Sequence, residues 1–189
     1  EVYITRIAQF LPNECVSNDE MEEYLGMIDN KRSKSKPVVL RNNGIKNRYY
    51  AIKKDGTPTH TNAELTALAV KKLFKDNPEE IKEMDFLSCG TSSPDQLMPS
   101  HGLMVHGELP ESDFIEVTSP SGNCCSGLHS IKHAFMGVKT GERNKAVATG
   151  SERLSCTMRH ENFEEEVQKL KELEQTPVLA FEKDFLRWM

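Results

Sequence analysis

The middle of the chain alternates short apolar segments with amphipathic ones, and this alternation limits the possible folds more than any other feature. Three segments have the length and composition of buried strands: "DFLSCG" (85–90), "DFIEVTS" (113–119) and "NKAVATGS" (144–151). Helical patterns, "HGLMVHGEL" (101–109) and "CSGLHSIKHAFMGVKTG" (125–141), lie between them. Strands and helices at this spacing predict an α/β fold with a mainly parallel sheet and right-handed crossovers.

The N-terminal part adds a strand and three helical signals. "VYITRIAQF" (2–10) is apolar on both faces and predicts a central opening strand. Ser17 and Glu20 have capping-box spacing ahead of a short helix. Thr61 and Glu64 have the same spacing ahead of a longer helix. Its expected buried face consists of Leu65, Leu68, Ala69 and Leu73. Asn77 and Pro78 then mark a further helix start.

The C-terminal tail (160–173) has an amphipathic pattern that places Phe163, Val167 and Leu170 on one side of a helix. The chain stops at "FEKDFLRWM" without a helix stop or a turn signal. This ending indicates a sequence that is cut rather than finished.

Charge and cysteine content restrict the function classes. The net charge of −5 argues against a general nucleic-acid binder. No apolar run is long enough to span a bilayer, so we expect no membrane partner. The N-terminus lacks the layout of a signal peptide, and the chain has five irregularly spaced cysteines, an odd number. We therefore expect reduced thiols in a cytoplasmic protein.

Two adjacent cysteines, in "PSGNCCSGLHS", lie where the second of these strands gives way to a helix. In parallel sheets reactive groups gather beyond the carboxyl ends of the strands, here in the loops 91–99, 119–125 and 151–158. Cys125 falls in the first turn of the helix, where free N–H groups and the helix dipole favour a thiolate and can hold an oxyanion. Gly122 and Gly127 would allow a sharp turn and a close approach to a ligand. This arrangement suits an acyl-accepting nucleophile.

The alternative is that both thiols are buried as small apolar side chains, which is the usual fate of a free cysteine. We expect Cys124 to pack inward. Helical spacing assigns a second set of residues to the core alone: Leu128, Ile131, Phe135 and Val138. The spacing favours Cys125 as the reactive thiol without excluding the alternative.

The "NCCSGLHS" block resembles the Ala-Cys-Ala/Ser-Gly-Phe signature of β-ketoacyl-acyl-carrier-protein synthase III, in the thiolase-like superfamily, with Cys124 in place of a small Ala. Four further blocks are similar in the same order. They are "ITRIAQFLPNECVSNDEMEEYL", "NGIKNRYY", "CGTSSPDQLMPSHGLMVHGEL" and "AVATGSERLS". The resemblance extends over nearly the whole chain.

This resemblance implies that residues 1–189 form the N-terminal one of two pseudo-repeated halves of a layered thiolase-like fold, and that the C-terminal half is absent from this chain. It also implies a Claisen condensation without a cofactor beyond the thioester substrates. Cys125 would take an acyl group from acyl-coenzyme A or acyl carrier protein. The carbanion from decarboxylated malonyl-acyl-carrier-protein would then attack the acyl-cysteine. The family would place Met98 at a homodimer interface, reaching toward the partner's acyl pocket.

Several departures from the family pattern bear on this expectation. The family's decarboxylating His and Asn belong to its second half, so this half alone should be inactive. The family's adenine-binding Trp is absent from "SKSKPVVLRNNGI", and Asn42 stands where the family has Arg, although Arg41 is adjacent. Acyl carrier protein therefore becomes a strong alternative to coenzyme A as the donor. The tail 159–175 is longer than the family loop and is expected to reshape the acyl channel.

Other residues support weaker hypotheses. His129 and His133, four residues apart, could hold zinc, but no third ligand is spaced to complete a site, and we predict no metal. His129 could polarise Cys125, although contact with a neighbouring loop is the better expectation. Glu152 is expected to support loop structure. A basic cluster is either a solvated loop or, with Arg41, a contact for coenzyme A or an acidic carrier: Lys31, Arg32, Lys34 and Lys36.

Three alternatives to the condensing enzyme stay open. The first is a non-decarboxylative or hydroxymethylglutaryl-coenzyme-A-synthase-like acyltransferase. The second is a non-catalytic thiolase-fold partner, and the third is a metal-binding interaction module.

Overall fold

A computed structural model describes residues 1–182 of the chain and divides it into two units. The sheet unit comprises residues 1–13 and 58–154, and the hairpin unit comprises residues 14–57 and 155 onward. Each unit has its own cluster of buried apolar residues. Each is described separately below.

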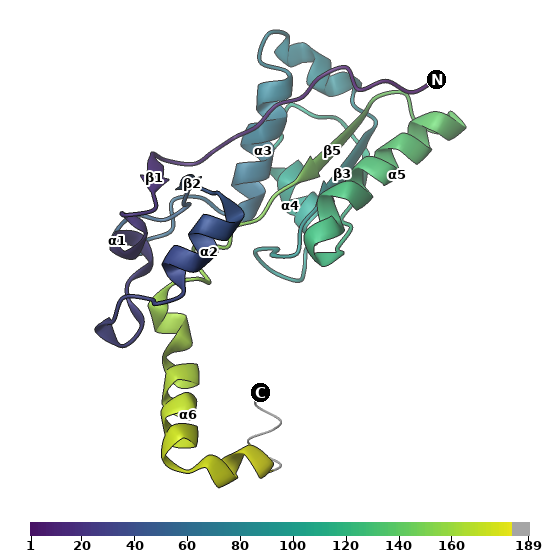
Figure 1. The fold of residues 1–189 in the computed structure, drawn as a ribbon. Helices are drawn as coiled ribbons and strands as arrows, with labels where there is room; N and C mark the ends of the chain where they lie inside the picture. The colour runs from purple at the N-terminus through teal and green to yellow at the C-terminus, as the bar shows by residue number, and fades with distance from the viewer. Residues whose placement is uncertain (183–189) are drawn as a thin grey trace. The chain divides into compact units, whose positions relative to one another are not determined.

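The sheet unit contains the predicted parallel sheet. Its strands are β3 (Phe86–Gly90), β4 (Glu116–Thr118) and β5 (Ala146–Gly150), in the order β4-β3-β5, and both pairings are parallel (Figure 1). Its helices are α3 (Asn62–Leu73), α4 (His101–Gly107) and α5 (Ser126–Thr140), with short 3₁₀ helices η2 (Pro78–Glu83) and η3 (Asn123–Cys125). The α/β expectation and all three mid-chain strands are confirmed.

Alternate residues of β3 face different helices, because successive side chains of a strand point to opposite faces. Leu87 and Cys89 join the main core with residues from α3 and α4, among them Val70 and Val105. Phe86, Ser88 and Gly90 face the other way, and α5 covers that side of β3 and β5. The five residues of β3 are all buried, which fits a central strand.

Helix α3 begins as predicted but buries a different face. Thr61 accepts a hydrogen bond from the Glu64 N–H, and the Glu64 carboxylate accepts one from the Thr61 N–H, which completes the capping box. Leu65 is buried, whereas Leu68, Ala69 and Leu73 are only half-buried. The fully packed stripe instead runs through Ala63, Ala67 and Val70, because small residues let α3 lie close to the core.

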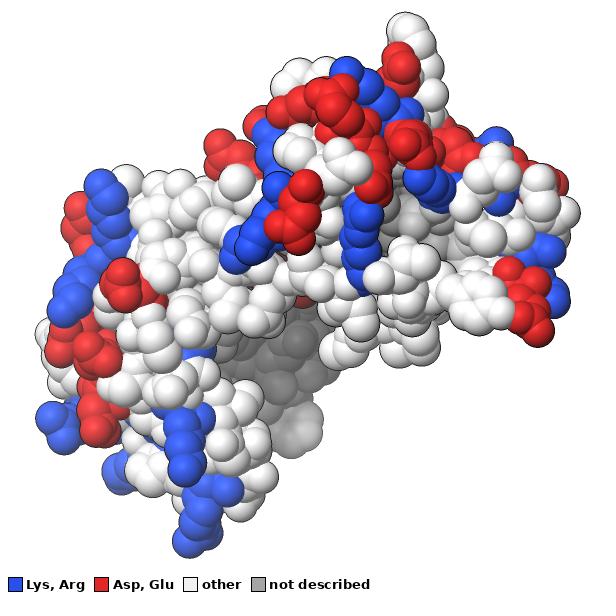
Figure 2. Space-filling view, turned by 90° about the horizontal axis from the view of Figure 1, so that it is seen from above, with Lys and Arg blue, Asp and Glu red and all other residues white. Residues whose placement is uncertain are grey.

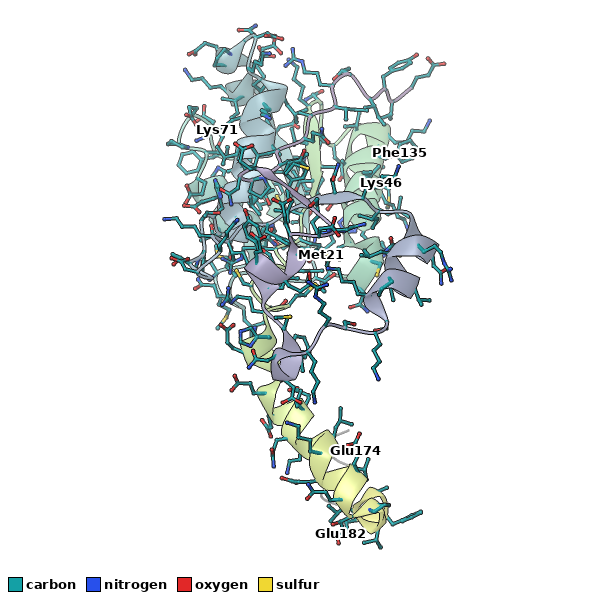
Figure 3. The ribbon with its side chains drawn as sticks, turned by 60° about the vertical axis from the view of Figure 1, so that its left-hand side comes forward. Met21, Lys46, Lys71, Phe135, Glu174 and Glu182 are labelled. Atoms are coloured by element: carbon teal, nitrogen blue, oxygen red, sulfur yellow. The ribbon has the colours of Figure 1, made fainter. Side chains whose placement is uncertain are left out.

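The face of α5 was predicted wrongly. Leu128, Ile131 and Phe135 were expected in the core, yet they are 65%, 51% and 49% exposed, and Figure 3 labels Phe135 on this helix. Val138 is half-buried. The buried residues of α5 are Ser126 and Ser130. Small side chains therefore contact the sheet, and the large apolar ones point away from it.

The opening strand was also predicted wrongly. Residues 1–12 form no strand, and side chains such as Tyr3 and Ile7 are largely exposed. A strand is stable only where a neighbouring strand satisfies its backbone, and no strand of the described residues pairs with this segment. Apolar composition alone was therefore an insufficient signal.

The hairpin unit is built on two short antiparallel strands, β1 (Cys15–Ser17) and β2 (Asn47–Tyr49). Helices α1 (Met21–Leu25), η1 (Ile28–Asn30) and α2 (Lys36–Asn43) lie between them in sequence. Elements η4 (His160–Phe163), α6 (Glu164–Gln175) and η5 (Pro177–Phe181) follow Ser155. Val16, Tyr50 and Ile52 form its small core.

Two helices of the hairpin unit bear on the predictions. Helix α1 starts later than the Ser17 signal, although Ser17 donates hydrogen bonds from both N–H and Oγ to the Glu20 carboxylate. The amphipathic tail is helical as expected, but α6 has no buried residue, and Figure 3 labels Glu174 on it.

None of the described helices has the length and apolar content needed to cross a bilayer.

Candidate functional site

Cys125 lies at the N-cap of α5, at the end of the sheet where β3, β4 and β5 have their carboxyl ends. Its side chain is exposed. The loop from Thr91 to Pro99, the turn from Ser119 to Cys125 and residues 151–154 meet at this edge, as hydrogen bonds between them show. The predicted convergence of these three segments is therefore found within the sheet unit.

The turn that carries Cys125 differs from the expectation in one respect. Gly122 is extended (φ −167°), and Asn123 is the residue in the left-handed region (φ 49°). Asn tolerates this conformation better than most side chains because its short amide can bond locally. The Cys125 N–H donates to the Gly122 carbonyl at 2.9 Å, so the proposed oxyanion donor already has an acceptor within the turn.

Gly122 lies against the ring of His129. A Cβ at this position would lie 2.8 Å from the His129 ring. His129 therefore packs on the turn, which agrees with the expectation that it contacts a neighbouring loop. The exposed His129 ring thus covers the turn at the first part of α5.

Two further glycine contacts bring α5 close to the sheet. A Cβ on Gly90 would lie 2.2 Å from the Ser126 carbonyl oxygen, and a Cβ on Gly150 would lie 3.1 Å from the Gly127 Cα. Gly127 was expected to approach a ligand, and in the structure it approaches β5 instead. Gly90 and Gly150 were not singled out from the sequence, although each ends a predicted strand, which was the available signal.

A carboxylate from the end of β5 fastens the loop that follows β3. Glu152 accepts the Ser92 N–H at 2.7 Å and also the Ser93 hydroxyl. Arg153 pairs with Asp95 at 3.3 Å, and Asp95 accepts the N–H groups of Asn62 and Ala63 at the start of α3. The hypothesis that Glu152 supports loop structure is confirmed by these contacts.

The other cysteines have contrasting environments. Cys89 is fully buried, and burial raises the pKa of its thiol to about 12. Cys124 was expected to pack inward, but it is exposed, because η3 and the left-handed residue Asn123 turn the pair toward solvent. Cys15 is exposed and Cys156 is half-buried in the hairpin unit. Cys124 and Cys125 are therefore the two exposed cysteines of the sheet unit, and both lie at the site.

Buried polar side chains lie behind the same loops. His101 is 2% exposed, and its Nε2 lies 3.3 Å from both the Thr66 and the Ser151 hydroxyls. Burial lowers the pKa of His101, while the charges of Asp95 and Glu152 oppose this shift. The Asn62 amide donates to Thr91 Oγ1 and to the Ser93 carbonyl. These residues connect α3 and α4 to the loops, and the sequence reasoning missed them because isolated polar residues in helices give no signal.

Met98 lies on the loop after β3 and is 86% exposed. Its neighbour Leu97 is equally open to solvent. Two large apolar side chains on an exposed loop tip suit a contact with another chain, and the assignment of Met98 to a dimer interface stays a prediction.

Part of the predicted basic cluster lines a cavity of about 830 Å³ in the hairpin unit. Arg32, Lys36 and Arg41 contribute to its wall, together with Lys46, which the sequence analysis did not select. Lys36 pairs there with Glu22. Lys31 and Lys34 lie outside the lining. Figure 2 shows a face of the molecule on which basic and acidic side chains are intermixed in small groups.

Lys31 has a different partner. It donates to Asp29 at 2.8 Å, and Asp29 also accepts from Lys171 of α6. These two lysines lower the pKa of Asp29 to about 2.

Among the described residues no group of three or more His, Cys, Asp or Glu side chains is arranged to hold a metal ion. His129 and His133 both lie on the exposed part of α5.

No protein-family model matches the chain. The chain is, however, 25% identical over 156 residues to the β-ketoacyl-[acyl-carrier-protein] synthase III of Streptococcus sanguinis, a match that covers 82% of this chain and 44% of that enzyme. The chain thus spans less than half the length of the curated relatives that it matches.

Solved structures agree in fold. AbyA1, described as a tetronic acid condensing enzyme, is similar with a TM-score of 0.68 and 22% identity, over 79% of this chain and 43% of that one. A structure of Xanthomonas campestris OleA, a cysteine-to-serine variant with bound lauric acid and lauroyl-CoA, has a TM-score of 0.59 and 18% identity. It covers 76% of this chain and 41% of OleA.

The parallel sheet, its helices and the cysteine turn at the end of β4 therefore define a layered α/β protein of the thiolase-like fold. Over most of its length the chain is similar to β-ketoacyl-acyl-carrier-protein synthase III, and the coverage of both comparisons corresponds to one half of such an enzyme. The resemblance identified from the sequence is confirmed.

Proposed function

We propose that the protein is a condensing acyltransferase that forms a β-ketoacyl thioester, with Cys125 as the acyl-accepting nucleophile. The observation that carries this proposal is the exposed Cys125 side chain at the N-cap of a 15-residue helix, above the carboxyl ends of three parallel strands. Similarity to β-ketoacyl-acyl-carrier-protein synthase III supports the reaction class.

In the first step the Cys125 thiolate attacks the carbonyl carbon of an acyl thioester. A new C–S bond forms, the bond to the donor sulfur breaks, and the donor leaves as a thiolate that takes up a proton. The dipole and N–H groups at the start of α5 favour the oxyanion of the tetrahedral intermediate. The Cys125 N–H would exchange the Gly122 carbonyl for that oxyanion.

In the second step malonyl-acyl-carrier-protein loses carbon dioxide, and the electron pair of the broken C–C bond forms a new bond to the acyl carbon. Cys125 then leaves as a thiolate, which is favourable because sulfur is a good leaving group. The groups that assist decarboxylation would come from a C-terminal half, so we propose that residues 1–189 are the N-terminal half of the enzyme and inactive alone.

The exposed outer face of α5 supports the proposal of a second half. Leu128, Ile131 and Phe135 present large apolar side chains to solvent along one side of the helix. A soluble protein normally covers a contiguous apolar face of this kind. Met98 and Leu97 would make the homodimer contact from their loop. No cofactor beyond the thioester substrates enters the proposed reaction.

The cavity in the hairpin unit is the proposed contact for the donor. Arg32, Arg41 and Lys46 offer positive charge to the phosphates of coenzyme A or to an acidic acyl carrier protein. Lys36, also in its wall, is already paired with Glu22. Carrier protein and acyl-coenzyme A are thus the proposed partners, and the cytoplasm is the proposed compartment.

The test is incubation of the full-length protein with panels of acyl-coenzyme A and acyl-carrier-protein donors, followed by intact mass measurement. We expect one acyl adduct that disappears in Cys125→Ala and persists in Cys15→Ser, the matched exposed thiol. Addition of malonyl-acyl-carrier-protein should release carbon dioxide and remove the adduct.

The other arms of this experiment identify the alternatives. An adduct that condenses with a second acyl thioester without loss of carbon dioxide indicates a non-decarboxylative or hydroxymethylglutaryl-coenzyme-A-synthase-like enzyme. An absence of adduct with every donor indicates a non-catalytic thiolase-fold partner. An adduct that survives Cys125→Ala contradicts the assignment of the nucleophile.

A further inference from the structure

We propose that Ser92, Ser126 and Glu152 are positioning residues for Cys125, and that they act by holding the Asn123 carbonyl in place. The proposal rests on the proposed function, because it assumes that Cys125 is the nucleophile. Its physical basis is a chain of hydrogen bonds from the end of β5 to the turn that presents the thiol.

The Asn123 carbonyl is the centre of this arrangement. It accepts the Ser126 Oγ–H at 2.8 Å, the Ser92 Oγ–H at 2.7 Å and the Ser126 N–H. Asn123 is in the left-handed region, which is less favourable than the right-handed one for a residue with a Cβ. A conformation of this kind persists only where its surroundings hold it. Three donors on a single carbonyl supply that restraint.

Ser126 restrains two peptide groups of this turn, the one that follows Asn123 and the one that precedes Gly122. While its hydroxyl donates to the Asn123 carbonyl, the same oxygen accepts the Gly122 N–H at 3.0 Å. The Ser126 side chain is 2% exposed, so water does not compete freely for these bonds. The turn before Cys125 is therefore fixed on both sides of its left-handed residue.

Ser92 needs support of its own, because it lies on an exposed loop. Glu152 provides it: one carboxylate oxygen accepts the Ser92 N–H, and the other accepts the Ser93 hydroxyl. The Ser92 hydroxyl is thereby aimed at Asn123. The hydrogen bonds of the Glu152 carboxylate go to Ser92 and Ser93 and not to Cys125. Glu152 therefore acts on the thiol only by positioning Ser92.

The consequence is geometric. Cys125 follows Asn123 by two residues, and its N–H closes the turn onto Gly122. If the Asn123 peptide rotates, the thiol leaves the N-cap of α5, and the N–H groups of the first turn no longer face the reacting carbonyl. Loss of one hydroxyl should therefore slow acyl transfer more than it disturbs the fold.

The experiment measures acyl transfer to the full-length protein from octanoyl-N-acetylcysteamine, a thioester without a carrier or nucleotide. The rate is followed by intact mass. We expect about a fivefold loss of rate in Ser92→Ala and about tenfold in Ser126→Ala, of the order of one lost hydrogen bond. Ser92→Thr retains the hydroxyl and should restore the rate. Glu152→Gln should give a smaller loss than Ser92→Ala.

The matched control is Ser112→Ala. Ser112 also donates its hydroxyl to a backbone carbonyl of the sheet unit, that of Leu109 at 2.7 Å, but its partner lies in the loop after α4. This variant should lower the thermal midpoint about as much as Ser92→Ala and leave the acylation rate unchanged. Equal rates in wild type, Ser92→Ala and Ser126→Ala, or an equal slowing by Ser112→Ala, would overturn the proposal.

A second measurement separates this proposal from the proposed function. Iodoacetamide labelling compares Cys125 with Cys15 by peptide mass. If the wild type takes no acyl group, the proposed function fails, yet a fall in the Cys125-to-Cys15 labelling ratio in Ser92→Ala still supports positioning. An unchanged labelling ratio together with an unchanged acylation rate contradicts it.

Discussion

The two sides of strand β3 are built differently. On one side Leu87 and Cys89 contact large apolar residues such as Val70 of α3 and Val105 of α4. On the other side Gly90 meets Ser126 of α5, and Gly150 of the neighbouring β5 meets Gly127. The first side gains free energy from apolar burial, at about 2 kcal/mol for each large side chain. On the second side the small residues bring the first turn of α5 close to the ends of β3 and β5.

Proximity matters because of what the second side carries. Small residues allow the first turn of α5 to approach the carboxyl ends of β3 and β5, where the loops with Ser92 and Glu152 begin. Large residues at Gly90 or Gly127 would keep the helix and its N-cap cysteine away from those loops. Apart from Phe86, which is buried against α5, the apolar packing of β3 and the site geometry thus lie on opposite faces of the strand.

The largest expected effect tests the apolar side. Leu87→Ala removes a side chain that is completely buried, and the resulting cavity should lower the free energy of unfolding by about 3 kcal/mol. Urea denaturation measures it. An exposed leucine, Leu97→Ala, is the control and should change stability by less than about 0.5 kcal/mol. Similar losses for both would mean that this face is not the main core.

The next effect tests the small-residue side. Gly90→Ala adds a methyl group 2.2 Å from a backbone oxygen that cannot easily move, so we expect a loss of about 2 kcal/mol. Gly107→Ala, where a Cβ would meet nothing within 4 Å, should be neutral or slightly stabilising. Acylation of Cys125 should fall in Gly90→Ala even where the protein remains folded. A Gly90→Ala variant as stable and as active as wild type would contradict the close approach.

This difference also explains how far sequence reasoning reached. The apolar segments 85–90 and 144–151 predicted strands of the parallel sheet, observed at 86–90 and 146–150, and the "NCCSGLHS" block predicted the position of the thiol at the start of a helix, because both signals are local. The buried face of α5 was predicted wrongly, since hydrophobic periodicity marks large residues and this helix contacts the sheet through Ser126, Gly127 and Ser130.

The contacts of the site between residues far apart in the chain could not be predicted from the sequence. Ser92 and Asn123 are 31 residues apart, and Ser92 and Glu152 are 60 apart, so only the folded sheet brings them together. The opening strand failed for a related reason: residues 2–10 have strand composition, but a strand exists only with a partner. The sequence predicted a basic cluster that includes Arg32, Lys36 and Arg41, but it predicted neither the cavity that they line nor the part of Lys46 in its wall.

A smaller effect concerns pH and the buried His101 behind the loops. Burial lowers its pKa, so the folded chain binds a proton less readily than the unfolded chain does. As pH falls through about 6.5, the ordinary value, the unfolded state takes up more protons and stability is lost; above that pH the contribution is complete. The unfolding midpoint of wild type should therefore fall between about pH 7 and pH 5.

The control for this prediction is a comparison of two variants. His101→Gln should flatten the pH dependence, because it removes the buried group that faces Thr66 and Ser151. His106→Gln is the control: it removes an imidazole of the same helix that bonds the Asp113 carbonyl, and it should keep the pH dependence of the wild type. A wild-type slope that survives His101→Gln unchanged would assign the dependence to another group.

The smallest expected effect concerns the outer face of α5. In the 189-residue chain Phe135→Ala removes a side chain that is 49% exposed, and we expect the free energy of unfolding to change by less than about 0.5 kcal/mol. In the full-length protein the proposed second half would cover this face, and the same substitution should then cost about 2 kcal/mol. Thermal and urea denaturation of both chains provide the measurement. A large loss in the 189-residue chain would show that α5 packs through its large residues after all, and an equally small change in both chains would leave the apolar face uncovered and contradict the assignment of this chain as one half of a larger fold.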